Sequence, residues 1–130
     1  MYKQFLYNQL IKIDGFNCSQ LYRLSSIESD ISIEVMKVLL ENACLSQNEV
    51  PIMIARNILK NNDTLWLEKN ILPVAKTIIN MNDEWEYRRF YELVDLVAPG
   101  IVEDVIDLGV KSNNIDVVEA AFDFVKKQQF

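Results

Sequence analysis

Apolar residues recur every three to four positions along nearly the whole of this 130-residue chain. That spacing places them on one side of an α-helix. No segment alternates apolar and polar residues for long enough to predict a β-strand, and the short apolar runs VPIMI and IIN lie inside helical periods. With only three glycines and three prolines, long loops are not expected either. The sequence therefore predicts one all-α domain over residues 1–130.

Capping residues and prolines divide this pattern into a series of helices. The expected ranges are 2–12, a short helix near 18–26, 30–44, 46–62, 64–80, 83–98, 101–111 and 114–127. The candidate N-caps are Asp30, Asn48, Asp63 or Thr64, Asp83, and Asn113 or Asn114. Pro73 is expected to kink or split its helix near Leu72, because proline lacks the N–H that the helix needs. Asp83, followed three residues later by Glu86, is typical of a capping box.

The helix expected over 83–98 has two different sides. Phe90, Leu93 and Val97 fall on one apolar stripe, which predicts that they are buried in the core. The opposite side carries Arg88, Glu92 and Asp95, with Trp85 in line with them, and Glu84 lies one turn before Arg88. Either this side is a solvated helix surface, with Trp85 packed on a neighbouring helix, or Trp85 is an exposed anchor for a partner.

Acidic residues are concentrated in one region of the chain. Residues 83–107 hold eight acidic and two basic side chains, so their net charge of −6 equals that of the whole chain. Glu103, Asp104 and Asp107 share one side of the helix expected at 101–111. Such a surface either keeps a small protein in solution or attracts a basic partner. The predicted partner-binding residues are Glu84, Trp85, Glu92, Asp95, Glu103, Asp104 and Asp107.

Several kinds of functional site lack their usual residues. The chain has no histidine, which removes the commonest general base and most zinc sites. Its glycines stand apart, so no phosphate-binding loop is present. Cys18 and Cys44 do not have metal-binding spacing and are expected to be small buried hydrophobes, with a disulfide or a reactive thiol as alternatives. We therefore expect no catalytic residues, cofactor or metal, although an enzyme that uses carboxylates stays open.

The expected environment is the cytoplasm. No apolar run reaches about 18 residues, so no membrane span is predicted. The N-terminal MYKQFLYNQLIKI also lacks the apolar core and cleavage site of a signal peptide. The acidic surface would repel phosphates, which argues against binding to nucleic acid.

A weak internal repeat is visible. SQNEVPIMIARNILKN, from Ser46, aligns with SNNIDVVEAAFDFVKK, from Ser112, at an offset of 66 residues with four identities. The offset is twice 33, and the helix expected at residue 83 falls near the midpoint. Either two amphipathic helices match by coincidence, or the chain repeats a helical pair that buries its apolar face by stacking on its neighbours.

The segments DEWEYRRFYELVD and GVKSNNIDVVEAAFDF resemble the HEAT-like helical-pair repeats of small bacterial proteins. Among these they are similar to the immunity proteins of polymorphic toxin and contact-dependent growth inhibition systems. The resemblance covers roughly residues 46–127. It implies antiparallel helix pairs stacked as a short right-handed array, and a protein that neutralises a toxin by binding it.

Charge then suggests the kind of partner. A nuclease toxin is basic because it must attract phosphates, and an inhibitor can present carboxylates where the substrate would lie. The first hypothesis is an immunity protein that binds a basic toxin domain, plausibly a ribonuclease. The alternative is a HEAT-like adaptor or scaffold with no toxin partner.

Overall fold

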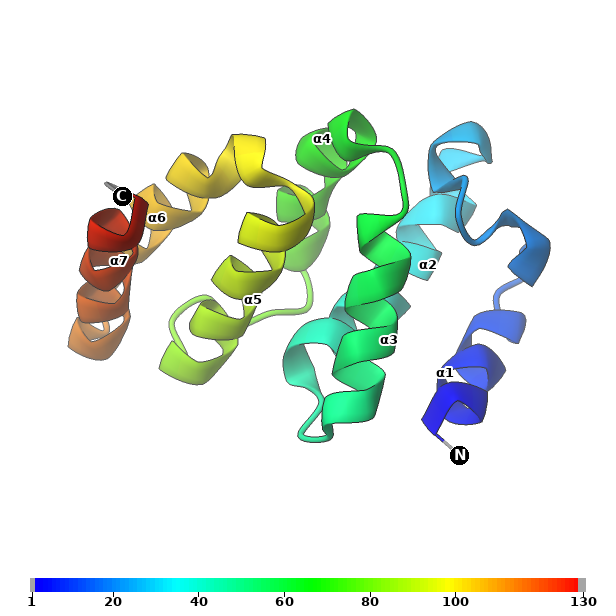
Figure 1. Cartoon of the computed structure of the whole chain (residues 1–130), viewed down its shortest axis with the longest axis horizontal. Helices are drawn as coiled ribbons and strands as arrows, with labels where there is room; N and C mark the ends of the chain where they lie inside the picture. Colours follow the sequence, from blue (N-terminus) through cyan, green and yellow to red (C-terminus); the bar gives the residue numbers. More distant parts are fainter. Residues whose placement is uncertain (1, 129–130) are drawn as a thin grey trace.

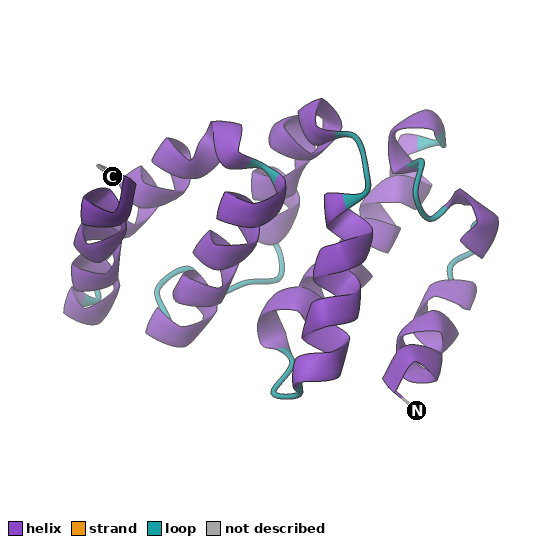
Figure 2. Ribbon diagram, viewed as in Figure 1, coloured by secondary structure: helices purple, strands orange, loops and turns teal. Residues whose placement is uncertain are grey.

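The computed structural model describes residues 2–128, and within that range every regular element is a helix (Figure 2). The α-helices are α1 (Tyr2–Ile11), α2 (Ser29–Leu40), α3 (Glu49–Lys60), α4 (Thr64–Ala75), α5 (Glu84–Val97), α6 (Val102–Val110) and α7 (Ile115–Gln128). Short 3₁₀ turns lie at Cys18–Gln20, Leu24–Ser26 and Pro99–Ile101, and a π-helical turn spans Glu41–Leu45. The all-α prediction is confirmed, and the short helix expected near 18–26 is two 3₁₀ turns.

Side-chain caps start three of the helices where the sequence predicts them. Asp63 accepts a hydrogen bond from the backbone N–H of Trp66 at 3.0 Å, and Asp83 accepts one from Glu86 at 2.9 Å. Asn114 does the same for α7, at 2.9 Å. Each cap satisfies a backbone donor that has no partner within its own helix.

The expected capping box at the start of α5 is only half formed. Asp83 caps the helix, but the carboxylate of Glu86 accepts from the backbone N–H of Asn80 instead of from that of Asp83. Asp30 is not a cap either, because α2 begins one residue earlier and Asp30 lies in its first turn. Asn48 occupies the N-cap position of α3 but makes no capping hydrogen bond with its side chain.

Two helices end well before the residue that the periodicity predicts. The helix expected over 30–44 is α-helical only to Leu40 and then widens into the π-helical turn. Pro73 lies inside α4, which ends at Ala75, although the pattern predicts helix to residue 80. A proline removes one hydrogen bond from the helix. That bond would reach back to the carbonyl of Lys69, and its loss does not split α4 near Leu72, where a kink or split was expected. After Ala75, the Thr77 hydroxyl donates to the carbonyl of Val74 at 2.7 Å.

The helices form two layers (Figure 1). The helices α1, α3, α5 and α7 lie side by side in the layer drawn in front, and α3, α5 and α7 run in the same direction. Contacts from α1 to α3, from α3 to α5 and from α5 to α7 join this layer. The helices α2, α4 and α6 lie behind it. Helices α3 and α7 begin 66 residues apart, at Glu49 and Ile115, which is the offset of the two aligned segments.

The core lies between the layers, and α5 contributes much of it. Phe90, Leu93 and Val97 are buried, as predicted. Tyr87 and Tyr91 are buried beside them, and their rings contact Phe124 of α7, with the Tyr91 and Phe124 rings stacked at 3.6 Å between centroids. Burial of this apolar side is what orients α5, so its polar side faces outward. Within residues 2–128, no helix is long and apolar enough to cross a membrane.

Candidate partner-binding surface

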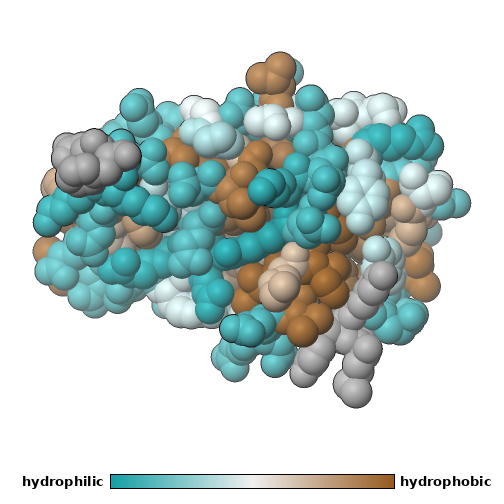
Figure 3. Space-filling view, viewed as in Figure 1, coloured by the Kyte–Doolittle hydropathy of each residue, from teal (hydrophilic) through white to brown (hydrophobic). Residues whose placement is uncertain are grey.

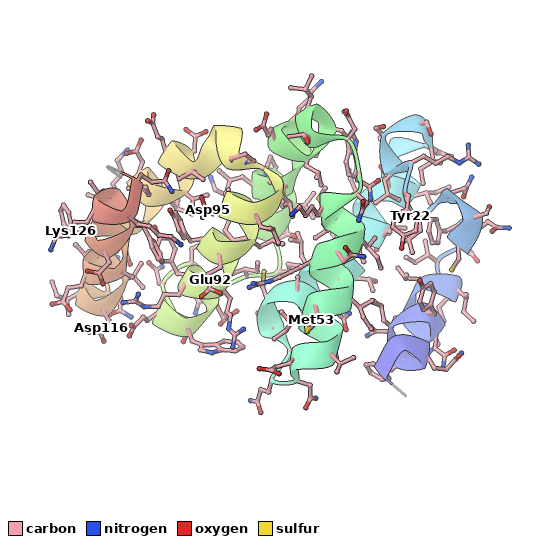
Figure 4. The ribbon with its side chains drawn as sticks, viewed as in Figure 1. Tyr22, Met53, Glu92, Asp95, Asp116 and Lys126 are labelled. Atoms are coloured by element: carbon pink, nitrogen blue, oxygen red, sulfur yellow. The ribbon has the colours of Figure 1, made fainter. Side chains whose placement is uncertain are left out.

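The outward side of α5 holds four of the predicted partner-binding residues. Figure 4 shows Glu92 and Asp95 on α5 in the front layer, together with Met53 of α3 and Lys126 of α7. Because α3 and α7 flank α5, its polar side chains can reach either neighbour. The ion pairs and hydrogen bonds of each acid show whether it is paired within the chain or open to a binding partner.

Glu84 is bonded within the chain. Its carboxylate accepts a hydrogen bond from Nε of Arg88 at 2.8 Å, which is the pair expected from their spacing. The same guanidinium reaches Asp123 of α7 at 3.5 Å and lies over the ring of Phe124. The hydrogen bond with Glu84 raises the pKa of Arg88. Arg88 thus links α5 to α7 and is more than a surface residue.

Glu92 points toward the other neighbour of α5, which is helix α3. Its carboxylate lies 3.4 Å from a terminal nitrogen of Arg56 on α3. The Arg56 side chain is only 19 % exposed, and its Nε is buried with no hydrogen-bond partner. Glu92 therefore supplies the one ion pair that this partly buried cation makes among residues 2–128. Its first role is structural, although the sequence predicts a docking residue.

Asp95 is also engaged, at the end of α5. Its carboxylate lies 3.7 Å from Nζ of Lys127 and accepts a hydrogen bond from Gln128 at 3.2 Å. The same amide nitrogen of Gln128 donates to the hydroxyl of buried Tyr91 at 2.6 Å. Asp95 and Tyr91 therefore hold the last turn of α7 against α5.

Trp85 lies between the two interpretations that its sequence position allowed. Its side chain is 41 % exposed, so it neither packs fully on a neighbour nor stands free. The guanidinium of Arg89 lies over its indole ring, 5.0 Å from the centroid. A cation–π contact of this kind holds both groups at the surface in one arrangement. Trp85 remains a candidate contact for a partner.

The acids of α6 differ from those of α5. Glu103, Asp104 and Asp107 are exposed, and none of them makes an ion pair within the described part of the chain. Glu103 and Asp107 line a hollow of about 660 Å³ between α6 and the end of α7, whose walls include Val125 and Gln128. Glu103 and Asp104 lie in the first turn of α6, where acids stabilise a helix, but no described cation neutralises the three carboxylates, so they can meet a cation from outside.

The predicted site is therefore two groups of residues that meet at one side chain. Gln128 lines the hollow beside Glu103 and Asp107, and it also donates to Asp95. Glu84, Trp85 and Glu92 lie farther along α5, in the front layer. Asp95 is linked to the α6 hollow through Gln128, whereas Glu84 and Glu92 form ion pairs with Arg88 and Arg56.

A second hollow has no counterpart in the sequence interpretation. It encloses about 730 Å³ beside the π-helical turn and is lined by α1, α3 and the segment after α4. Phe5, Val50 and Met53 are exposed on the helices near it, and Figure 3 shows hydrophobic side chains over the lower part of α3, beside a mostly hydrophilic surface over α5 and α7. The periodicity hides this site, because residues 41–45 are read as ordinary helix.

The two cysteines are not bonded to each other. Cys44 is buried in the π-helical turn, and burial raises the pKa of its thiol to about 12. This confirms the prediction of a small buried hydrophobe for Cys44, whereas Cys18 is half-buried. Over the described range, no three His, Cys, Asp or Glu side chains lie close enough together to hold a metal ion.

Comparisons with protein families, with curated proteins and with solved structures found no match for this chain.

Proposed function

We propose that this protein is a helical binding protein whose α6 carboxylates dock a basic protein partner. The observation that carries the proposal is the group Glu103, Asp104 and Asp107, which is exposed, unpaired within residues 2–128, and set beside a hollow. Carboxylates that no internal cation neutralises contribute most to the field that an approaching basic surface meets.

The partner class that suits this surface best is a basic toxin domain, plausibly a ribonuclease. The protein would then act as an immunity protein in the bacterial cytoplasm and would cover the surface that binds phosphates. The resemblance of residues 46–127 to such immunity proteins supports this function. So does the charge of residues 83–107, whose net value of −6 equals that of the whole chain.

We also propose that the two layers belong to a short HEAT-like array of antiparallel pairs, of which α2 with α3 and α6 with α7 pack directly on each other. The 66-residue offset between α3 and α7, and the shared direction of α3, α5 and α7, support this arrangement. Arrays of this kind also serve as adaptors, so a scaffold without a toxin partner is the second candidate. The identity of the bound protein separates the two, since only a toxin would harm cells that lack this protein.

The experiment is a charge reversal with a matched control. The test variant carries Glu103→Lys and Asp107→Lys, and the control carries Asp30→Lys and Glu34→Lys. Both pairs occupy the second and sixth positions of a helix, on α6 and α2 respectively, and all four side chains are exposed. Both variants change the net charge equally and place a cation equally near a helix start. Thermal melts first establish that each variant folds.

The partner is recovered by co-purification with the unaltered protein and identified by mass spectrometry. We expect the α6 variant to associate with the partner at least about tenfold more slowly than the unaltered protein does. Its affinity should also fall less steeply as salt is added. The α2 variant should keep most of the association rate. Equal rates for the two variants would show that the α6 acids only keep the protein in solution.

A further inference from the structure

The hollow beside the π-helical turn has the character of a small-molecule site. It is lined by residues of α1, of the π-helical turn, of the loop after that turn, of α3 and of the segment after α4. Its volume of about 730 Å³ falls within the range of about 300–1,000 Å³ that is common for ligand pockets. The walls are mainly apolar, with Phe5, Leu45, Pro51 and Ile78 among them. This apolar hollow shares no lining residue with the hollow beside the α6 acids.

One buried amide in the wall has an unused acceptor. Asn42 is only 6 % exposed, and its side-chain nitrogen donates to the carbonyl of Val38 at 2.8 Å and to Oε1 of Gln9 at 2.9 Å. A backbone carbonyl can only accept, so the contact with Val38 fixes which end of the amide is nitrogen. Both N–H groups are then used. Among the side chains that the structure describes, none donates to the carbonyl oxygen of Asn42, so this acceptor is open to a ligand.

The described wall of the hollow has one charged side chain, and it is acidic. Glu41 lines it and is exposed, and its carboxylate makes no ion pair with any described residue. No lysine or arginine is among the described residues of the walls. A ligand that complements this site therefore presents a positively charged donor to Glu41 and Asn42 and apolar surface to the remaining walls.

The π-helical turn is what places these groups together. Glu41, Asn42 and Leu45 all come from this turn, and all three line the hollow. A π-helical turn is a rare conformation that occurs frequently at functional sites, because it costs hydrogen-bond geometry that ordinary helix would keep. Its position beside this hollow is an observation independent of Asn42.

We propose that this hollow binds a small amphipathic amine, with its apolar body against Phe5, Leu45 and Ile78 and its ammonium group between Glu41 and Asn42. The ammonium donates hydrogen bonds to the Glu41 carboxylate and the Asn42 carbonyl oxygen. No covalent step is involved.

The test uses three probes that share an apolar body and differ in their head group: n-octylamine, 1-octanol and octanoate. Each is titrated into the 130-residue chain while backbone amide shifts are followed by NMR. We expect saturable binding with shifts centred on residues 41–51 and on α1. The amine should bind about two- to fivefold more tightly than the alcohol, as for one exposed ion pair, and octanoate should bind most weakly.

Two variants locate the site. Glu41→Gln keeps the shape of the side chain and should reduce the affinity for the amine to that for the alcohol, whereas Glu34→Gln, on α2 outside the hollow, should change nothing. Asn48→Trp fills the hollow from a position whose side chain makes no cap bond, and it should abolish binding of all three probes. The proposal is wrong if no probe binds at millimolar concentration, if octanoate binds as tightly as octylamine, or if Asn48→Trp leaves binding unchanged.

Discussion

Arg56 gives the nearby acid Glu92 a structural role, because the two side chains form an ion pair. It is partly buried between α3 and α5, with one nitrogen that has no hydrogen-bond partner, and Glu92 is the carboxylate that neutralises it. A buried cation whose partner is removed has to stay desolvated without compensation. Glu92 is 48 % exposed, so water lessens this cost without removing it.

We expect Glu92→Gln to lower the free energy of unfolding by about 1 kcal/mol, more than the few tenths of an exposed pair and less than a fully buried one. Chemical denaturation is the measurement. Glu34→Gln, which breaks the exposed pair with Lys37, is the control and should cost about 0.5 kcal/mol or less. In an Arg56→Met background the Glu92→Gln cost should vanish. A cost that persists there would mean that Glu92 acts through some other contact.

At the scale of single residues, the sequence predicts which acids belong to the candidate site better than it predicts which of them are paired within the chain. The pair between Glu84 and Arg88 follows from their spacing along one helix. The pair between Arg56 and Glu92 joins residues 36 positions apart, and that between Lys127 and Asp95 joins residues 32 apart. Such contacts depend on which helices become neighbours, which no local pattern records.

At the scale of the elements, the packing of α6 against α5 depends on one glycine. Tyr87 of α5 is buried, and its hydroxyl donates to the carbonyl of Val105 at 2.8 Å. A Cβ atom at Gly109 would overlap that hydroxyl and press against Ala121 of α7. Gly109 therefore lets three helices approach closely, which is a requirement of packing and not of backbone conformation.

We expect Gly109→Ala to destabilise the protein by about 1–3 kcal/mol, even though alanine favours helix by about 1 kcal/mol over glycine. Thermal and denaturant melts measure the change. The loss should be smaller in a Tyr87→Phe background, because the hydroxyl is the atom that the new methyl group meets first. Val110→Ala, at the exposed neighbouring position, should cost less than Gly109→Ala. If the two substitutions cost the same, the close approach does not limit stability.

The starts of three helices were predictable because a capping residue precedes each of them. Asp63, Asp83 and Asn114 are polar residues placed just before apolar periods, and each caps its helix. The π-helical turn was not predictable, because widening one turn leaves the apolar spacing over 30–44 nearly unchanged. The hollow beside it was missed for the same reason.

At the scale of the whole molecule, each helix contacts only its neighbours in the two layers. Helix α5 packs on α3, α6, α7 and the π-helical turn, whereas α1 and α7 stand at the two ends of the front layer. In a stacked array such as the one proposed above, stability is close to a sum of the units and of the interfaces between neighbours. The ends therefore have fewer interfaces to lose.

We expect native-state hydrogen exchange to be slowest in α5 and faster in α1 and α7, because terminal units open without disrupting the centre. Exchange of individual amides followed by NMR is the measurement. Glu92→Gln should speed exchange in α3 and α5 more than in α7, since the pair that it breaks joins the first two. Equal protection throughout would show instead that the molecule opens as one unit.

The two arginine bridges in the front layer reach acids at the same helix position, although Arg56 is the eighth residue of α3 and Arg88 the fifth of α5. Arg56 of α3 reaches Glu92 of α5, and Arg88 of α5 reaches Asp123 of α7. Glu92 and Asp123 are both the ninth residue of their helices. Helix α5 thus holds both halves of the bridge, an acid for the helix before it and an arginine for the helix after it. It carries both kinds of side chain that such a bridge needs. A second copy of this helix, placed beside the first, could therefore form the same bridge with it.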